Sequence, residues 1–347
     1  MTPAELSRTV LHAVRRAVDE GELSVTVPER AVVAPPGPGG CGDYATNIAL
    51  QLARAAGRPP RDVAEVLRAR LLDEQRFADV VVTGPGFLNV SLRGTASAGL
   101  VEEILRRGRR YGHATTGTVG SVVRLSCPAE VRAVVVADAL ARVLRSQGDV
   151  AHVECEGRPA REWESVLGAD VTARGPRTAD RHVTVRPVPA PADPLPLGRD
   201  AGRWALLHPA AHDRPRIPGD HLVQREGNPL FRVRYVHART RALLRNAADL
   251  GFHPEPGPVS EADALTAVLG DHPRVVAATA AQHTPDRLAR HLVTVADAAM
   301  PLLPAVLPLG EEKPSAAHRA RLALAEAAGT VLAGGLSLLG IDAPDHL

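Results

Sequence analysis

Apolar residues recur at helical spacing near both ends of the chain. Leu6, Val10, Leu11 and Val14 fall on one face of a helix expected over residues 4–19. The buried face of a helix expected over 229–250 would consist of Val233, Val236, Thr240, Leu243, Leu244 and Ala247. Further helices are expected near 260–270, 272–281, 285–300 and 314–339, the last burying Leu322, Leu324, Val331, Leu332, Leu336 and Leu339. Residues 228–347 are therefore expected to form an all-helical bundle.

Short runs of strand-forming residues, separated by turn residues, follow the first helix. Residues 77–82 and 87–92 resemble two strands joined by the turn at 84–86, which predicts a hairpin. Asp43 can cap a helix that runs to Ala56 and ends at Gly57. Helices are also expected over about 61–73 and in the segment that ends at Arg109. Residues 1–112 should therefore form a small α/β domain.

The middle of the chain, residues 113–227, opens with a strand–helix–strand pattern. The strands are expected at 121–126 and 150–155, and the helix near 130–147, with Gly148 after its end. From Arg158 onward the chain is rich in Pro, Arg and Asp and shows little periodicity. Its candidate elements are a third strand at 180–186, a polyproline-like connector at 187–196 and a helix at 198–207.

The expected helix over 229–250 is basic on the side opposite its apolar face. That side carries Arg232, Arg234, Arg239, Arg241 and Arg245, with Tyr235 among them. Guanidinium groups can hold phosphates in a bidentate way, and an aromatic ring can stack on an unpaired base. A solvated charged surface on a helical bundle would give the same pattern, and both interpretations remain open at this point.

Several short motifs narrow the choice. The run Asn228-Pro-x-Phe-x-Val-x-Tyr-x-His-Ala-Arg239 closely resembles the opening of the anticodon-binding helical domain, of the DALR type, of arginyl-tRNA synthetases. The stretch Gly42-Asp-Tyr-Ala-Thr-Asn-Ile-Ala-Leu50 resembles the N-terminal domain peculiar to those enzymes, and so do residues 84–90 and 110–112. The last ten residues are similar to the end of the family's sequences. The implied fold class is a multidomain α/β plus all-α protein: a small N-terminal α/β domain, a shortened Rossmann-like remnant and a C-terminal helical bundle.

The resemblance also implies which residues contact RNA. In the family, an aromatic residue and an amide after the Gly-Pro-Gly turn contact an unpaired base of the tRNA, and these positions match Phe87 and Asn89. Phe87 could instead be a core residue of the hairpin, with Asn89 a surface polar group. The candidate tRNA-binding residues are Phe87, Asn89, Asn228, Arg232, Arg234, Tyr235, Arg239 and Arg241.

The family's catalytic motifs have no counterpart in this sequence. Its His-x-Gly-His turn, which holds ATP phosphates, would fall at Cys127-Pro-Ala-Glu130, or it has been deleted outright where the strand ends at 126–128. In either case both histidines are missing, and Glu130 adds a negative charge. The family's lysine-bearing loop is also missing, because Lys313 is the only lysine and lies in the helical region. The segment 113–227 is much shorter than a full catalytic core. We therefore expect no catalytic residues, no cofactor and no ligase activity.

Composition sets limits on the possible partners. The net charge is +2 and the pI about 8.6, so binding to RNA must come from local basic patches. Cys41, Cys127 and Cys155 are widely spaced, so neither a zinc site nor a disulfide framework is expected. No export signal or membrane span is expected, which favours a cytoplasmic protein. The expected partner is tRNA, most simply an arginine tRNA, and neither DNA nor membrane.

Two alternative functions remain open from the sequence. The chain could be a protein-interaction or regulatory module linked to the catalytic arginyl-tRNA synthetase or to amino-acid metabolism. It could also be a residual enzyme of ligase type that binds arginine or ATP.

Overall fold

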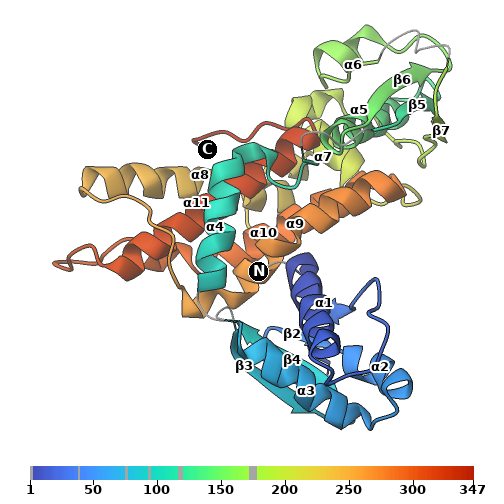
Figure 1. Cartoon of the computed structure of the whole chain (residues 1–347). Helices are drawn as coiled ribbons and strands as arrows, with labels where there is room; N and C mark the ends of the chain where they lie inside the picture. Colours follow the sequence, from blue (N-terminus) through green and yellow to red (C-terminus); the bar gives the residue numbers. More distant parts are fainter. Residues whose placement is uncertain (1–2, 38–39, 75–76, 93–94, 116–119, 172–177) are drawn as a thin grey trace. The chain divides into compact units, whose positions relative to one another are not determined.

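The computed structural model describes residues 3–37, 40–74, 77–92, 95–115, 120–171 and 178–347 (Figure 1). Contacts divide the chain into two compact units. The first contains residues up to 100 together with 257–260, and the second contains 101–256 and 261–347. Helix α4 (Thr95–Arg107) begins in the first unit and ends in the second.

The first unit is a four-stranded antiparallel sheet with helices on one face. The strand order is β1-β2-β4-β3. Its elements are α1 (Pro3–Asp19), β1 (Val33–Ala34), β2 (Tyr44–Thr46), α2 (Ile48–Ala56), α3 (Pro60–Leu72), β3 (Phe77–Thr83) and β4 (Phe87–Leu92). Apolar side chains of the three helices form one core with those of β3 and β4. Leu6, Val10, Leu11 and Val14 belong to this core, which confirms the face predicted for the first helix.

The hairpin is confirmed, whereas the predicted helix cap at Asp43 is wrong. Strands β3 and β4 pair across the 84–86 turn, with Thr83 opposite Phe87. Residues 44–46 form strand β2 instead of the start of a helix, and α2 begins at Ile48 after Asn47. The carboxylate of Asp43 accepts a hydrogen bond from the backbone N–H of Leu92 at 2.6 Å. It therefore caps the end of β4 and is not available to the helix.

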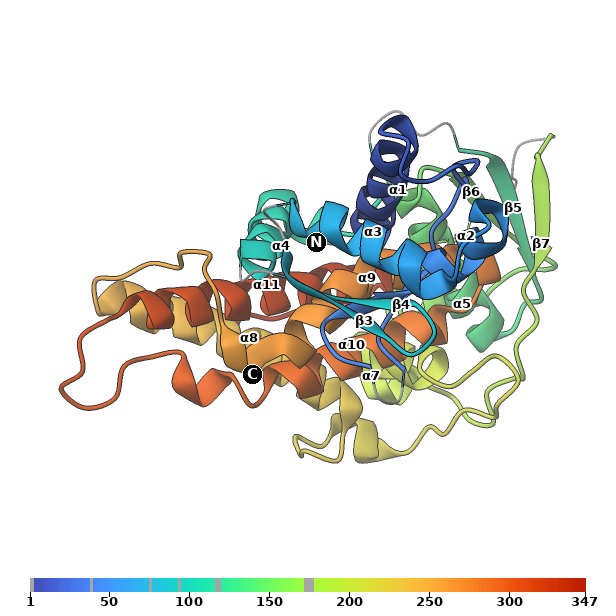
Figure 2. The same ribbon diagram turned by 60° about the horizontal axis from the view of Figure 1, so that its bottom comes forward.

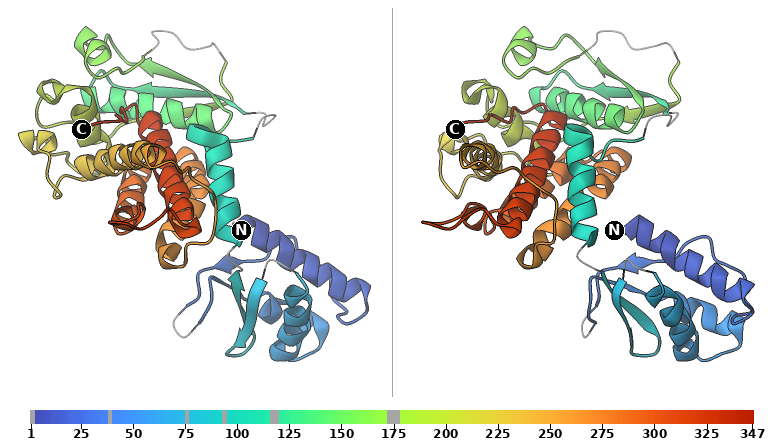
Figure 3. Two further views of the ribbon diagram at one scale, coloured as in Figure 1. Left: turned by 90° about the vertical axis from the view of Figure 1, so that its left-hand side faces the viewer. Right: turned by 60° about the vertical axis from the view of Figure 1, so that its left-hand side comes forward.

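The second unit contains a three-stranded parallel sheet of order β6-β5-β7, with β7 at an edge (Figure 2). The strands are β5 (Val122–Cys127), β6 (Val150–Cys155) and β7 (Arg181–Thr184). Helix α5 (Val131–Ser146) connects β5 to β6 and is buried along almost its whole length. It lies between the sheet and the long helices of the same unit (Figure 3). The strand–helix–strand pattern predicted for this region is confirmed.

The bundle predicted for residues 228–347 consists of α8 (Pro229–Asp249), α9 (Asp263–Gln282), α10 (Pro285–Ala299) and α11 (Ala316–Leu338). Two further helices, α6 (Arg161–Ser165) and α7 (Gly198–Leu207), precede it in the chain. The short 3-10 helices are η1 (Gly108–Arg110), η2 (Leu195–Leu197), η3 (Gly219–Leu222), η4 (Ser260–Ala262) and η5 (Leu303–Ala305). Helices α8 and α11 pack side by side (Figure 2). All six leucines and valines predicted to be buried in and after α11 are buried.

The two helices predicted at 260–270 and 272–281 are a single helix, α9, with Pro273 inside it. A proline in a helix removes the hydrogen bond to the carbonyl four residues earlier. Here that carbonyl belongs to Leu269, and it accepts a hydrogen bond from the Tyr111 hydroxyl at 3.4 Å. The helix continues through the proline because a residue from a distant segment provides the missing donor.

Two buried arginines join the small parallel sheet region to the rest of the second unit. The guanidinium of Arg132, on α5, donates to five backbone carbonyls, those of Val188, Leu206, Pro209, Ala210 and Asp213, at 2.7–3.1 Å. Arg203, on α7, forms an ion pair with Asp138 of α5 at 2.6 Å. Its guanidinium also donates to the carbonyls of Leu167 and Leu339, at 3.0 and 2.7 Å. Both side chains are fully buried, so the chain around them forms one packed body.

Candidate nucleic-acid interface

Helix α8, the predicted RNA-binding helix, begins with a side-chain cap. Oδ1 of Asn228 accepts hydrogen bonds from the backbone N–H groups of Leu230 and Phe231, at 3.1 and 3.4 Å. Its Nδ2 donates to the carbonyls of His221 and Val223, at 2.9 and 3.0 Å. Asn228 is only 6% exposed. The side chain therefore fixes the start of α8, and we leave it out of the RNA contacts proposed below.

This cap leads to a first prediction. The Asn228→Ala variant should lose about 1–2 kcal/mol of its free energy of unfolding, because the cap and its partners in the preceding loop are lost together. Urea titration measures the change, and Asn246→Ala, at an exposed position near the end of the same helix, is the matched control. Equal stability of the two variants would contradict the capping role.

The basic side of α8 is smaller than the sequence suggests. Arg232 pairs with Asp297 of α10 at 3.3 Å, and Arg234 pairs with Asp200 of α7 at 3.4 Å. Arg241 pairs with Asp345 near the C-terminus at 3.2 Å. These carboxylates come from segments distant in the sequence, so the helix pattern alone could not predict the pairing. Three of the predicted phosphate contacts therefore already have an acidic partner.

Arg239 remains exposed, and none of the described carboxylates forms an ion pair with it. Tyr235 lies one turn earlier on the same side of α8 and is 39% exposed. The ring of Phe231, one turn earlier again, lies 5.7 Å from the Tyr235 ring, centroid to centroid. The exposed ridge of α8 thus presents the guanidinium of Arg239 beside one supported aromatic ring, and Arg245, also exposed, lies nearer the end of the helix, where it contacts His346.

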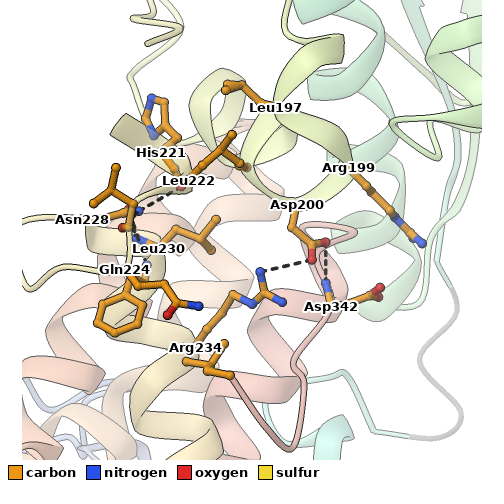
Figure 4. A pocket seen from close by; sticks show the side chains of 14 residues that line it. Leu197, Arg199, Asp200, His221, Leu222, Gln224, Asn228, Leu230, Arg234 and Asp342 are labelled. Atoms are coloured by element: carbon orange, nitrogen blue, oxygen red, sulfur yellow. Dashed lines mark hydrogen bonds and ion pairs between the residues drawn. The ribbon is translucent and has the colours of Figure 1, made fainter. Parts of the chain in front are cut away.

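A cavity of about 290 Å³ opens beside the start of α8 (Figure 4). It lies between α7, η3, the first turns of α8 and the last residues of the chain. Two apolar side chains at its edge, Leu222 and Leu347, are 56% and 50% exposed. The Asp200–Arg234 ion pair lines it too, and Oδ1 of Asp200 accepts a hydrogen bond from the backbone N–H of Asp342 at 3.0 Å. Apolar walls beside fixed polar groups suit a flat ring with hydrogen-bonding edges.

The N-terminal end of α5 is occupied by the side chain of Glu130. Its carboxylate accepts hydrogen bonds from the backbone N–H groups of Arg132 and Ala133, at 3.1 and 2.9 Å, and from Ala190 at 3.2 Å. Free N–H groups at a helix start are where a phosphate would bind. An acidic side chain already holds them, and its charge would repel a second anion.

In the first unit, the two predicted contacts differ in accessibility. Phe87 is 41% exposed and can present its ring to a ligand. Asn89 is 2% exposed, and its Nδ2 donates to Oγ1 of Thr83 at 2.6 Å across the hairpin. The alternative of a core Phe87 with a surface Asn89 is therefore wrong on both counts, and we leave the buried Asn89 out of the proposed contacts.

Sequence reasoning missed one group of side chains. Arg109, Arg142 and Arg199 line a common small cavity although they are distant in sequence. No spacing signal links them, so only the fold could reveal the group. Across the described residues there is no cluster of three or more potential metal ligands, and no described helix is long and apolar enough to cross a membrane.

Comparisons with known proteins fit this architecture. The family model described as "Arginyl tRNA synthetase N terminal domain" matches residues 4–92, and the "DALR anticodon binding domain" matches residues 233–347. An arginine–tRNA ligase from Frankia alni is 26% identical over 557 positions, with both chains covered in full. One from Renibacterium salmoninarum is 32% identical over 267 residues, which are 73% of this chain and 46% of that protein.

Solved structures agree in fold. The arginyl-tRNA synthetase of Thermus thermophilus matches with a TM-score of 0.63 at 15% identity, over 100% of both chains. That of Plasmodium falciparum matches with a TM-score of 0.67 at 9% identity, over 99% of both. They confirm the predicted combination of α/β sheets with a C-terminal helical region. The chain belongs to the arginyl-tRNA synthetase family and carries that family's N-terminal domain and its DALR anticodon-binding domain.

Proposed function

We propose that this chain binds tRNA, most simply an arginine tRNA, through its N-terminal and DALR domains without attaching arginine to it. The absence of arginine attachment is proposed from one observation, the Glu130 carboxylate at the start of α5. In the family resemblance, α5 corresponds to the helix that follows the ATP-binding turn. A carboxylate at that position opposes the binding of a polyphosphate.

The length of the middle segment supports the same conclusion. The alignment with the Frankia protein runs over 557 positions and covers both chains fully, whereas this chain has 347 residues. The missing positions therefore lie inside the chain. Lys313, the only lysine, precedes α11 and is far in sequence from the parallel sheet. The segment 113–227 is thus proposed to be a shortened core remnant between domains at 1–112 and 228–347.

The exposed ridge of α8 and the adjacent cavity are the proposed RNA contacts of the DALR domain. Tyr235 would stack on an unpaired base and Arg239 would hold a phosphate, while the cavity lined by Leu222 and Leu347 would take a second base. Phe87 would provide a separate contact from the N-terminal domain. Arg232, Arg234 and Arg241 contribute only if the RNA displaces their carboxylate partners.

A double substitution tests this interface. Tyr235→Ala with Arg239→Gln should weaken binding of an arginine tRNA transcript about 10- to 100-fold, because a stacking contact and a phosphate contact are lost. The slope of log affinity against log salt should fall by about one, as expected for one phosphate. Filter binding over a salt series measures both quantities. Arg287→Gln, at an exposed arginine on α10, is the charge control. An unchanged affinity and slope would refute this assignment.

A charging assay tests the non-catalytic half of the proposal. The chain, supplied with arginine, ATP, Mg²⁺ and arginine tRNA, should produce no arginyl-tRNA above background, and Glu130→Gln should not restore it. The Glu130→Gln substitution removes the charge that repels a phosphate, but it does not restore the histidines and the lysine that the family's catalytic motifs contain. Arginyl-tRNA formation that scales with the amount of this chain would overturn the proposal.

One observation favours a second function beside RNA binding. Leu222, Val223 and Leu347 are exposed apolar side chains around one cavity, a feature found at protein interaction sites. A protein partner, including the catalytic synthetase, would cover them. Purification from the native host, with and without ribonuclease, distinguishes the two: a partner that remains after RNA digestion binds the protein itself.

A further inference from the structure

Three arginines from separate elements surround a cavity of about 100 Å³ in the second unit. Arg109 lies in η1, Arg142 in α5 and Arg199 at the start of α7. The opposite wall is formed by Ala333 and Ser337 of α11 and by the chain at 340–343. The cavity is distinct from the one in Figure 4, although Arg199 and Asp342 line both.

The side chains around this cavity carry an excess of positive charge. Arg142 pairs with Asp138 at 3.0 Å, and Asp138 is shared with the buried Arg203. The acidic side chain in the lining itself is Asp342. Arg109 and Arg199 are both exposed, and no described carboxylate forms an ion pair with either. Three arginines and one aspartate therefore line the cavity, and the single Asp138 carboxylate is shared between Arg142 and Arg203.

Two glycines allow these arginines to approach closely. A Cβ atom at Gly334 of α11 would lie 2.7 Å from the backbone oxygen of Arg109, so a larger residue would push η1 away. A Cβ atom at Gly168 would lie 3.1 Å from Nε of Arg199, and Gly168 has a φ of +62°, which favours glycine. Close packing thus sets the backbone position of Arg109 and brings the side chain of Arg199 against Gly168.

We propose that this arginine cavity, lined by Arg109, Arg142 and Arg199, binds a phosphate group. Guanidinium groups converging from several directions are the usual protein ligands of phosphate oxygens. The volume suits a compact anion better than a nucleoside, which also needs space for a base and a sugar. The phosphate can belong to an RNA backbone or to a small free ligand.

The neighbouring cavity favours the RNA backbone as the source. A second space of about 250 Å³ lies between α8, α11 and η1, and it shares Arg109 and Ala333 with the arginine cavity. A phosphate held by Arg109 could therefore belong to a strand that continues along α8 toward Arg241, which lines that second space with its partner Asp345 and with Glu326. In this form the inference extends the proposed RNA binding, whereas a free phosphate ligand would be independent of it.

The test uses the full chain with Arg109→Gln and Arg199→Gln combined. A control variant carries Arg161→Gln and Arg287→Gln, which remove the same charge at exposed positions on α6 and α10. Two probes are applied: an arginine tRNA transcript over a salt series, and inorganic phosphate at millimolar concentration with chloride at equal ionic strength. Unfolding in phosphate-free buffer confirms that both variants fold. Arg142 is left in place because it pairs with buried Asp138.

The RNA form predicts an approximately 10-fold loss of tRNA affinity and a salt slope smaller by about one, in the cavity variant only. The free-ligand form predicts that phosphate raises the melting temperature of the wild type and the control but not of the cavity variant, with tRNA binding unchanged. The proposal is refuted if the cavity variant keeps both the tRNA affinity and the phosphate response of the wild type. If the wild type binds no tRNA but its phosphate response depends on these arginines, the proposed function fails and the phosphate site stands.

Discussion

The Asp138→Ala variant is expected to lose about 3–5 kcal/mol of its free energy of unfolding, because it leaves the buried charge of Arg203 without a counterion. Asp138 and Arg203 are both buried, and their ion pair is 2.6 Å long. The two carbonyls that Arg203 also contacts cannot replace a full negative charge. Burial already lowers the pKa of the Arg203 guanidinium, and Asp138 opposes that shift.

Tryptophan fluorescence during urea titration measures this loss directly. Both tryptophans, Trp163 and Trp204, lie in the second unit, so the signal reports that unit alone. The control is Arg142→Gln, which removes the more exposed partner of Asp138 and keeps the buried pair. It should cost less than about 1 kcal/mol. If Asp138→Ala were as stable as this control, the buried pair would not support the unit as described.

The second large effect is a loss of stability in mild acid. Two stacked histidines, His272 of α9 and His291 of α10, have ring centroids 5.2 Å apart, and the Tyr111 ring also stacks on His272, at 5.9 Å. Burial lowers the pKa of His272 to about 3 and that of His291 to about 4, from 6.5. Below pH 6.5 these two histidines therefore bind protons in the unfolded chain but stay neutral in the folded chain. Stability should be unaffected above that pH and should fall between about pH 6.5 and 4.

Each of these two histidines should lower the free energy of unfolding by about 2 kcal/mol at pH 5 relative to pH 7.5. His113, His208, His237 and His283 shift in the same direction, again mainly through burial. The His272→Phe variant keeps an aromatic ring in contact with Tyr111 and His291 but removes the titrating group, so its stability should depend less on pH. Urea titrations at both pH values measure this, with His212→Gln, at an exposed histidine, as control. An equal pH dependence in the wild type and His272→Phe would contradict the assignment.

The local pattern of apolar and polar residues was sufficient to predict most helices and strands and the buried faces of the helices. The positions predicted as buried in α8 are buried or nearly so, because a helix that packs on α11 must place its apolar residues on one side. The pattern failed at Pro273, where the Tyr111 hydroxyl compensates from a distant segment. It also failed at Asp43, whose carboxylate binds the end of a strand that comes much later in the chain.

The candidate interface was harder to predict for the same physical reason. The sequence places several arginines on one side of α8 but does not indicate that Asp200, Asp297 and Asp345 neutralise three of them. Nor does it indicate that the side-chain amides of Asn228 and Asn89 donate hydrogen bonds to a nearby backbone carbonyl and a nearby hydroxyl group. The negative charge of Glu130 just before α5 was visible in the sequence, whereas its hydrogen bonds to the first turn of that helix were not. Long-range pairing determines which polar groups remain free to bind a ligand.

Arg203 connects α5, the loop at Leu167 and the end of α11 at Leu339 inside the second unit. On the proposed function, the chain no longer needs a nucleotide-binding core for chemistry. It still cannot discard the sheet and α5, because without Asp138 of α5 the buried charge of Arg203 on α7, which also contacts the end of α11, would lose its counterion. Folding, and not catalysis, would then set the lower limit to how far such a protein can shrink. The sheet and α5 would persist as scaffolding for the domain that meets the RNA.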